Sequence, residues 1–443
     1  MKKSAGGGII RRNKVGRLIR KKIGNEVYIN SVRDEKFKSD RITVNLITPL
    51  DRKEATVNAL VPFVLRKGCK SCPDFTELNK RLAKMYGAIL DADVSKQGGF
   101  QIVELLLQFA DDKFAINGEE MVKEGAKLLS DIVFDPNLDE NGLFPKKDLE
   151  LEKEYLIDTI NSDLNDKRTY AIHRAVEMEF EGEPFGVSRY GYAEEAEKIT
   201  GEELAAAWRR LIKTARIEIM FVGPGDPAAV EEVFAKRLAL AEREPLETEK
   251  APLVPYKEHK EAKEAMDIVQ GKLVMGFRMG APATEREKNA ARVLSAMYGG
   301  TPFSKLFMNV REKLSLCYYV TSHFERGTGV MFVDCGIEFE SRDEAQSEIL
   351  RQLENIANGG ITEEELAGTK LIIKNSLGSV EDSLSGIDNW YMTCVLDGLI
   401  LTPEEDAAEI DKITAEEVAA MAKRAKLSAV FFLEGGKQNE LRN

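Results

Sequence analysis

The stretch KITGEELAA at residues 198–206 recurs as KITAEEVAA at residues 412–420, an offset of 412 − 198 = 214 residues. In both copies a threonine is followed three residues later by a glutamate, which is the capping-box signature of a helix start. Each capped helix precedes a short apolar strand that ends in glycine, at 217–223 and at 429–436. Two such units in the same order predict a duplicated chain with domains of about 200 residues.

Length and composition agree with a globular protein of two or more domains. The chain has 443 residues, which exceeds what a single core usually holds, with 43% hydrophobic and 31% charged residues. No apolar run approaches the ~20 residues of a membrane-spanning helix, so we expect no membrane association. The net charge of −12 argues against a nucleic-acid partner. Five scattered cysteines favour a reducing compartment, and we expect a cytoplasmic protein.

The order of the expected elements favours an α+β fold, with a mostly antiparallel sheet and packed helices in each of two tandem domains. Strand and helix patterns alternate in blocks rather than one by one, and a similar order begins again after residue 265. The expected organisation is a basic arm at 1–22, an N-terminal domain at 23–239, a linker rich in Glu, Lys and Pro at 240–265, and a C-terminal domain at 266–443.

The stretch NVREKLSLCYYV at 309–320 carries the most suggestive side chains of the second domain. Its pattern predicts the end of a helix that runs into an apolar strand. Arg311 and Tyr318 are seven residues apart, which is about two helical turns, so they share a face if the helix persists. An ordinary amphipathic helix with a charged face is the alternative interpretation of this spacing.

The R-E-x-x-x-L-x-Y pattern at 311–318 resembles the C-terminal domain of the insulinase, or M16, metallopeptidases. The strand QGKLVMGF at 270–277 and the L-x-x-x-L-x-x-x-Y-G-A pattern at 78–88 are similar to elements of the same family. The resemblance covers about residues 24–436. It implies that Arg311 and Tyr318 hold the substrate carbonyl at a zinc site that another domain builds.

The zinc motif of active members is missing from this chain. Those members carry H-x-x-E-H on their first long helix, where two histidines bind Zn²⁺ and the glutamate activates the metal-bound water. The family register, set by FVLRKG at 63–68, assigns the two histidine positions to Ala59 and Phe63, and the base to Pro62. Thr159 falls on the third ligand position, and no histidine precedes His173. The resemblance therefore implies no metal, no cofactor and no autonomous peptidase activity.

The remaining candidate ligands are dispersed. Cys69 and Cys72 form a single C-x-x-C without a second pair, so they are either incidental thiols or a redox or partial metal site. His173, His259 and His323 are far apart in sequence, and neither a G-x-G-x-x-G nor a Walker motif occurs.

Taken together, the resemblance implies a non-catalytic, substrate-positioning subunit of a heterodimeric zinc metallopeptidase. Its partner would carry H-x-x-E-H, and the substrate would be a peptide or an unfolded polypeptide. Arg311 would clamp the substrate and Tyr318 would donate to the oxyanion in trans, with the neighbouring Tyr319 as the rival donor. The alternative is an inert scaffold or peptide-binding protein of the same fold, of a type that is also associated with modification of translation elongation factor P.

Overall fold

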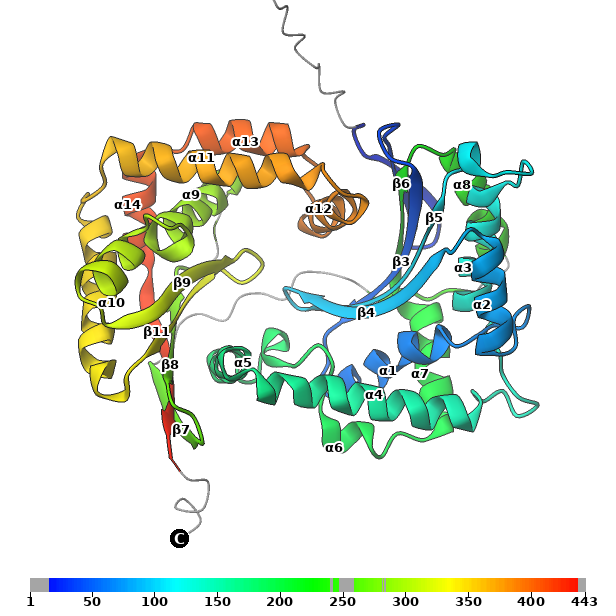
Figure 1. Ribbon diagram of the computed structural model, residues 1–443, viewed down its shortest axis with the longest axis horizontal. Coiled ribbons are helices and arrows are strands. Elements are labelled where there is room, and N and C mark those ends of the chain that lie inside the picture. The colour runs from blue at the N-terminus through cyan, green and yellow to red at the C-terminus, as the bar shows by residue number, and fades with distance from the viewer. Residues whose placement is uncertain (1–15, 240–241, 247–258, 281, 283, 437–443) are drawn as a thin grey trace, which may run out of the picture.

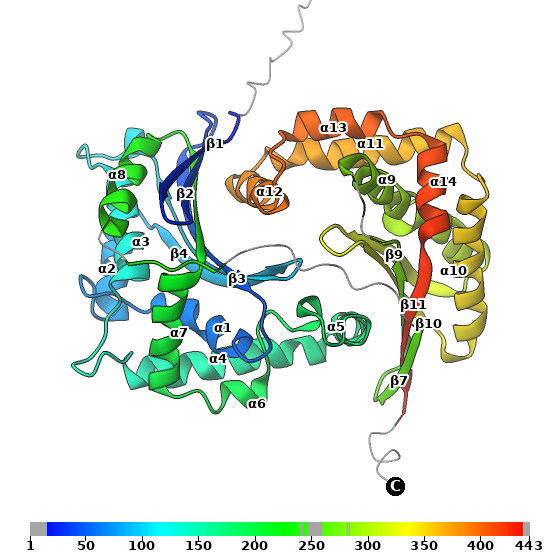
Figure 2. The same ribbon diagram turned by 180° about the vertical axis from the view of Figure 1, so that it is seen from behind.

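The computed structural model describes residues 16–239, 242–246, 259–280, 282 and 284–436. Two halves face each other, and each is a mostly antiparallel sheet with helices on its outer side (Figures 1 and 2). The α+β fold with two similar domains is therefore confirmed. Most of the basic arm and of the linker lies outside the described residues. Within the described ranges, no helix has the length and apolar character that a membrane crossing requires.

The N-terminal sheet has the strand order β1-β2-β6-β3-β5-β4. Its strands are β1 (Ile19–Gly24), β2 (Val27–Arg33), β3 (Ser39–Pro49), β4 (Ile89–Gln97), β5 (Phe100–Ala110) and β6 (Arg216–Gly223). Neighbouring strands are antiparallel except β2 and β6, which are parallel. Strands β4 and β5 form a hairpin with its turn at Gly98 and Gly99.

The C-terminal sheet repeats this arrangement with the order β7-β11-β8-β10-β9. Its strands are β7 (Lys260–Met266), β8 (Gly271–Arg278), β9 (Cys317–Glu325), β10 (Val330–Ile337) and β11 (Lys426–Gly435). Here β7 and β11 are the parallel pair, and the other neighbours are antiparallel. Strand β7 lies almost entirely within the expected linker at 240–265, and β1 overlaps the expected arm, so both sheets begin earlier than the sequence predicted. The charged, half-exposed residues of β7 do not show the apolar pattern on which that prediction relied.

The two sheets correspond strand by strand, which explains the repeated stretch in the sequence. In chain order β2 to β6 match β7 to β11, and the closing strand of each half enters the sheet at the same place. Thr200 and Thr414 each form the predicted capping box, in which the threonine side chain accepts from the third helical N–H and the glutamate accepts from the threonine N–H. Thr362 and Thr402 form two further capping boxes.

Helices cover the outer face of each sheet and fill one core per half. In the N-terminal half these are α1 (Ala55–Leu65), α2 (Phe75–Lys84), α3 (Met121–Phe134), α4 (Lys146–Asn165), α6 (Ala193–Ala196), α7 (Gly201–Thr214) and α8 (Pro227–Leu238). In the C-terminal half they are α9 (Glu285–Ser295), α10 (Arg342–Ala357), α11 (Glu363–Val380), α13 (Pro403–Asp411) and α14 (Ala415–Arg424).

The inner face of each sheet is covered by a helix that belongs to the other half. Helix α5 (Lys167–Glu179) packs on β8 and β11, and α12 (Leu384–Asp397) packs on β3 and β6 (Figures 1 and 2). Strand residues alternate between the two faces, as β geometry requires. Phe432 of β11 therefore packs in the C-terminal core, whereas its neighbour Phe431 packs against α5. The second apolar face of each sheet is thus buried without a further layer.

Ion pairs accompany both exchanged helices. Arg168 on α5 binds the Asp334 carboxylate on β10 with two hydrogen bonds of 2.6 and 3.3 Å. Arg41 on β3 donates to Asp388 on α12 at 2.7 Å and lies 3.4 Å from Glu104 on β5. The hairpin tips also meet, because a Cβ placed on Gly327 would lie 3.0 Å from the Cα of Gly98. The two halves are consequently joined at three places.

The carboxylates around Arg41 predict a stability that falls as the pH rises. Burial, followed by the nearby Asp388 carboxylate, raises the pKa of Glu104 to about 7 from an ordinary value of 4.5. Between these two pH values the folded chain keeps a proton that the unfolded chain releases, so the free energy of unfolding decreases with pH across this window. We expect the urea concentration at the unfolding midpoint to decrease as the pH is raised from 5 to 7.5. The decrease should be smaller in the Glu104→Gln variant.

The measurement is urea unfolding at pH 5, 6, 7 and 8. One titrating proton contributes at most about 1.4 kcal/mol per pH unit to the difference in slope. Asp40, whose pKa burial also raises to about 7, is present in both proteins and leaves a residual slope in the variant. Equal slopes for the two proteins would contradict the assignment to Glu104.

Candidate functional site

The positions that align with the zinc motif lie on α1, deep in the N-terminal half. Ala59, Pro62 and Phe63 are all buried, and Phe63 is only 2% exposed. Helix α1 packs against α4, α7 and the strands β4 and β5, which leaves these side chains in the apolar core. Pro62 lies inside the helix, where it lacks the N–H that would donate to the preceding turn.

An aromatic cluster surrounds Phe63, the residue that the sequence resemblance assigns to the second histidine position. The Phe63 ring meets the Tyr155 ring of α4 edge-on, at 5.2 Å between centroids, and lies 6.5 Å from the ring of Tyr190. The guanidinium of Arg66 lies over both Phe63 and Tyr155, at 5.2 and 4.9 Å from the ring centroids. We name Phe63, Arg66, Tyr155 and Tyr190 the aromatic cluster.

The residues of this region do not fit a zinc ion. The side chains of Ala59, Pro62 and Phe63 contain no donor atom, whereas zinc requires nitrogen, sulfur or carboxylate ligands. The nearby Glu152 carboxylate is already paired with Arg66 at 3.2 Å and with Lys67 at 2.6 Å. Across the described ranges, no group of three His, Cys, Asp or Glu side chains is arranged to hold a metal.

Thr159, the expected third ligand position, lies on α4 one turn after Tyr155. The ring that meets Phe63 belongs to Tyr155, and the Thr159 hydroxyl donates to the Tyr155 carbonyl at 2.8 Å. Sequence reasoning missed Tyr155, because the local pattern of α4 does not indicate which of its residues meets Phe63.

The C-x-x-C pair forms a tight turn in the core. Cys69 and Cys72 exchange two backbone hydrogen bonds of 2.9 Å, and both side chains are buried. Burial raises the pKa of the Cys69 thiol, which keeps it protonated and poorly nucleophilic. His173 lies on α5 and His323 on β9, and burial lowers the pKa of His323. These residues do not converge on one site.

Arg311 and Tyr318 lie on two consecutive elements of the C-terminal half. Arg311 is part of the π-helical segment η4 (Phe307–Lys313), and Tyr318 is the second residue of the edge strand β9. The helix does not persist to Tyr318, because Ser315 adopts a positive φ of 54° and ends it. The argument from two helical turns therefore does not apply, and η4 and β9 determine the spacing instead.

Both side chains are accessible and have partners on their own chain. The Tyr318 side chain is 60% exposed and its hydroxyl donates to the Glu338 carboxylate. The Arg311 guanidinium lies 3.8 Å from Glu312 and 4.6 Å from the centroid of the Phe307 ring. Sequence reasoning missed Glu338, because it is 20 residues from Tyr318 and follows the neighbouring strand β10.

The duplication provides a comparison for this pair. Tyr86 in the N-terminal half has a positive φ of 57° after α2, as Ser315 has after η4, an offset of 315 − 86 = 229 residues. The same offset pairs Arg311 with Leu82, and Tyr318 with Ile89, which is 59% exposed on the edge strand β4. The polar pair is therefore specific to the C-terminal half.

Tyr319, the rival donor, points to the inner face of the sheet. Its ring lies under the guanidinium of Arg168 at 4.5 Å, and its hydroxyl is buried without a hydrogen-bond partner among the described residues. Strand alternation thus separates the two neighbouring tyrosines, so that Tyr318 faces solvent and Tyr319 contacts α5.

The fold and the lost ligands define a two-domain protein of the M16 peptidase fold that lacks the zinc site. The family model named Peptidase M16 inactive domain matches residues 198–373. A probable inactive metalloprotease, YmfF of Bacillus subtilis, is 29% identical over 404 residues, which cover 91% of this chain and 95% of that protein. The chain is thus similar to inactive-type M16 proteins over most of its length.

Solved structures agree with this fold. A conserved protein from Enterococcus faecalis superposes with a TM-score of 0.88 at 28% identity, covering 96% of this chain and all of that one. A peptidase M16 inactive domain from Pseudomonas fluorescens superposes with a TM-score of 0.76 at 17% identity, covering 95% of this chain and 98% of that one. At the latter identity the likeness concerns the fold alone.

The packing of Phe63 in the aromatic cluster predicts that this residue contributes to stability. We expect Phe63→Ala to lower the free energy of unfolding by about 3–5 kcal/mol, because it removes a buried ring and leaves a cavity. Urea unfolding measures this, with Phe114→Ala as the matched control, since Phe114 is 48% exposed and such substitutions change stability by about 0.5 kcal/mol or less. Equal losses in the two variants would show that Phe63 does not pack as described.

Proposed function

We propose that this chain is a non-catalytic, substrate-positioning subunit of a heterodimeric zinc metallopeptidase. The partner carries the H-x-x-E-H motif, and this chain supplies Arg311 and Tyr318 to the partner's active site. The substrate is a peptide or an unfolded polypeptide. The chain's inactive-type M16 character supports the proposal, because a fold without its own metal site acts in cleavage only through another chain.

The observation that carries the proposal is the contrast between the two halves. Ala59, Pro62 and Phe63 are sealed in a core, so substrate cannot reach the former catalytic region of this chain. Arg311 and Tyr318 are accessible instead, at the end of a helix and on an edge strand. An exposed pair at a sheet edge is positioned for contact with a group that a second chain provides.

The chemistry of the two side chains suits this role. A zinc-bound hydroxide that attacks a peptide carbonyl creates an oxyanion, which a phenolic O–H stabilises by donating to it. Hydrogen bonding to Glu338 raises the pKa of Tyr318, so the hydroxyl remains protonated and able to donate. The Arg311 guanidinium is permanently charged and its several donors suit a clamp on substrate carbonyls.

The sheet edge offers a binding mode for the substrate. Among the described strands, β9 pairs only with β10 and lies at the margin of the C-terminal sheet. An extended peptide could add to this edge through main-chain hydrogen bonds, with Tyr318 beside it. Such binding depends little on side chains and fits a peptidase that accepts unfolded polypeptide.

The alternative is an inert scaffold or peptide-binding protein. It is favoured by the intramolecular partners of both side chains, because the Glu338 carboxylate occupies the Tyr318 hydroxyl and Arg311 lies beside Glu312. A scaffold needs no oxyanion donor. The Tyr318 hydroxyl is therefore required by the substrate-positioning function and not by the scaffold function.

The test is reconstitution with an H-x-x-E-H chain from the same source, assayed for zinc content and for cleavage of an unfolded polypeptide. We expect zinc to follow the partner and cleavage to need both chains. Tyr318→Phe should lower turnover by about 10²–10³-fold, the usual cost of one oxyanion donor. Arg311→Ala should lower kcat/KM by about 10²-fold, because substrate is no longer held in register.

Two neighbouring residues serve as matched controls. Tyr319→Phe removes a hydroxyl that faces α5, and Lys313→Ala removes a cation from the same helical segment as Arg311. Both variants should assemble and cleave like the parent chain. Full turnover in Tyr318→Phe and Arg311→Ala, with the complex still required, would favour the scaffold. Cleavage by the partner alone would refute the subunit function.

A further inference from the structure

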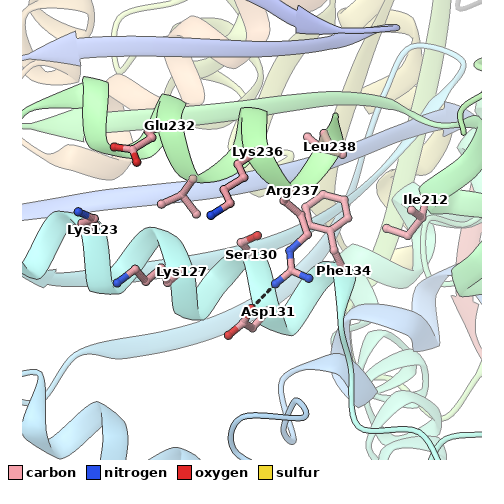
Figure 3. Close-up of a pocket in the computed structure, with 11 residues that line it drawn as sticks. Lys123, Lys127, Ser130, Asp131, Phe134, Ile212, Glu232, Lys236, Arg237 and Leu238 are labelled. Atoms are coloured by element: carbon pink, nitrogen blue, oxygen red, sulfur yellow. Dashed lines mark hydrogen bonds and ion pairs between the residues drawn. The ribbon is translucent and has the colours of Figure 1, made fainter. Parts of the chain in front are cut away.

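A cleft on the outer side of the N-terminal half lies between α3 and α8, well away from Arg311 and Tyr318 in the other half (Figure 3). Its volume of about 660 Å³ is within the range of small-molecule sites. The lining comprises Lys123, Lys127, Ser130, Asp131, Phe134, Ile212, Glu232, Val233, Lys236, Arg237 and Leu238. The proposed subunit function assigns no role to this cleft.

The lining combines charged side chains with an apolar wall. It contains three lysines, one arginine and two carboxylates, a formal charge of 4 − 2 = +2. Three of these cations also pair with carboxylates just outside the lining: Lys123 with Glu120, Lys127 with Glu124 and Arg237 with Asp135. Lys236 is therefore the cation that can attract an anion to the cleft. Phe134, Ile212 and Leu238 lie toward the end of the cleft where α3 and α8 finish (Figure 3).

The charges of the cleft are unequally neutralised. Asp131 is fully engaged, because Arg237 donates to one carboxylate oxygen and Ser71 to the other at 3.1 Å. Lys127 donates to Glu124 on its own helix at 2.8 Å. Lys236 makes no hydrogen bond or ion pair with any residue that the structure describes, and it extends from α8 toward α3 (Figure 3). Its ammonium group is therefore available to a ligand.

Ser130 provides the second, independent observation. It is 1% exposed, and its hydroxyl has no hydrogen-bond partner among the described residues. A buried hydroxyl without a partner costs about 1–3 kcal/mol, so such groups normally find an acceptor. In Figure 3 the Ser130 side chain points from α3 into the gap that Lys236 enters from α8. A ligand oxygen in this gap would accept from both groups.

We infer that this cleft binds a small organic anion, with its phosphate or carboxylate group between Lys236, Lys127 and Ser130 and its apolar body against Phe134 and Leu238. One anionic headgroup accepts a hydrogen bond from the Ser130 hydroxyl and forms an ion pair with the Lys236 ammonium. The apolar wall makes an organic anion a better ligand than an inorganic one, because burying apolar surface adds to the binding free energy.

The test is isothermal titration calorimetry of the full chain with phenyl phosphate, benzoate and inorganic phosphate. We expect one saturable site for phenyl phosphate or benzoate, with the tighter of the two identifying the headgroup, and binding of inorganic phosphate at least about tenfold weaker. Ser130→Ala and Lys236→Gln should each weaken binding by about tenfold or more, as loss of a charge-assisted contact predicts.

Lys146→Gln is the matched control, because Lys146 is an exposed lysine on α4 outside the cleft. It should bind the probe like the parent chain, and thermal unfolding should show that all three variants are folded. The inference is overturned if neither organic anion gives a saturable heat. It is equally overturned if Ser130→Ala and Lys236→Gln bind like the control.

Discussion

The reciprocal packing of α5 and α12 is the constraint on which the rest of the structure depends. Each sheet has two apolar faces, and its own helices cover only one of them. The second face is buried by a helix from the other half, so neither half is complete alone. The ion pairs Arg168–Asp334 and Arg41–Asp388 lie at these contacts. The Arg41–Asp388 pair is buried, so breaking it is costly and it favours one docking of α12, whereas the Arg168 side chain is 45% exposed and its pair contributes less.

The same architecture explains how a peptidase fold persists without its chemistry. Helix α1 lies between sheet and helices whatever side chains it carries, since the packing of the layer needs only volume and apolar surface. Phe63 and Tyr155 fill the space with rings, and Arg66 covers them. These rings pack well but supply no metal ligand. The region around Ala59, Pro62 and Phe63 is therefore filled by packed side chains.

The C-terminal half keeps its polar groups where a second molecule can meet them. Tyr318 and Tyr319 are adjacent, yet strand alternation directs one to solvent and the other to α5. The positive φ at Ser315 ends η4 and starts the approach to β9, which brings Arg311 and Tyr318 to the same margin of the half. Its counterpart at Tyr86 introduces an edge strand whose matching position is Ile89. The same backbone conformation thus precedes an edge strand in both halves, but the exposed side chain on that strand is polar in one half and apolar in the other.

The sequence by itself determined the duplication, the capping boxes at Thr200 and Thr414, the α+β class and the lack of an H-x-x-E-H motif, because these depend on local patterns and on residue identity. Only the tertiary structure decided which sheet each of α5 and α12 covers, that the Tyr155 ring meets Phe63, and that β7 belongs to the second sheet. It also brought the cleft between α3 and α8 together from segments about 100 residues apart. The physical reason is that the hydrophobic effect requires an apolar face to be buried but does not specify its partner. The path of the whole chain determines which element packs on that face.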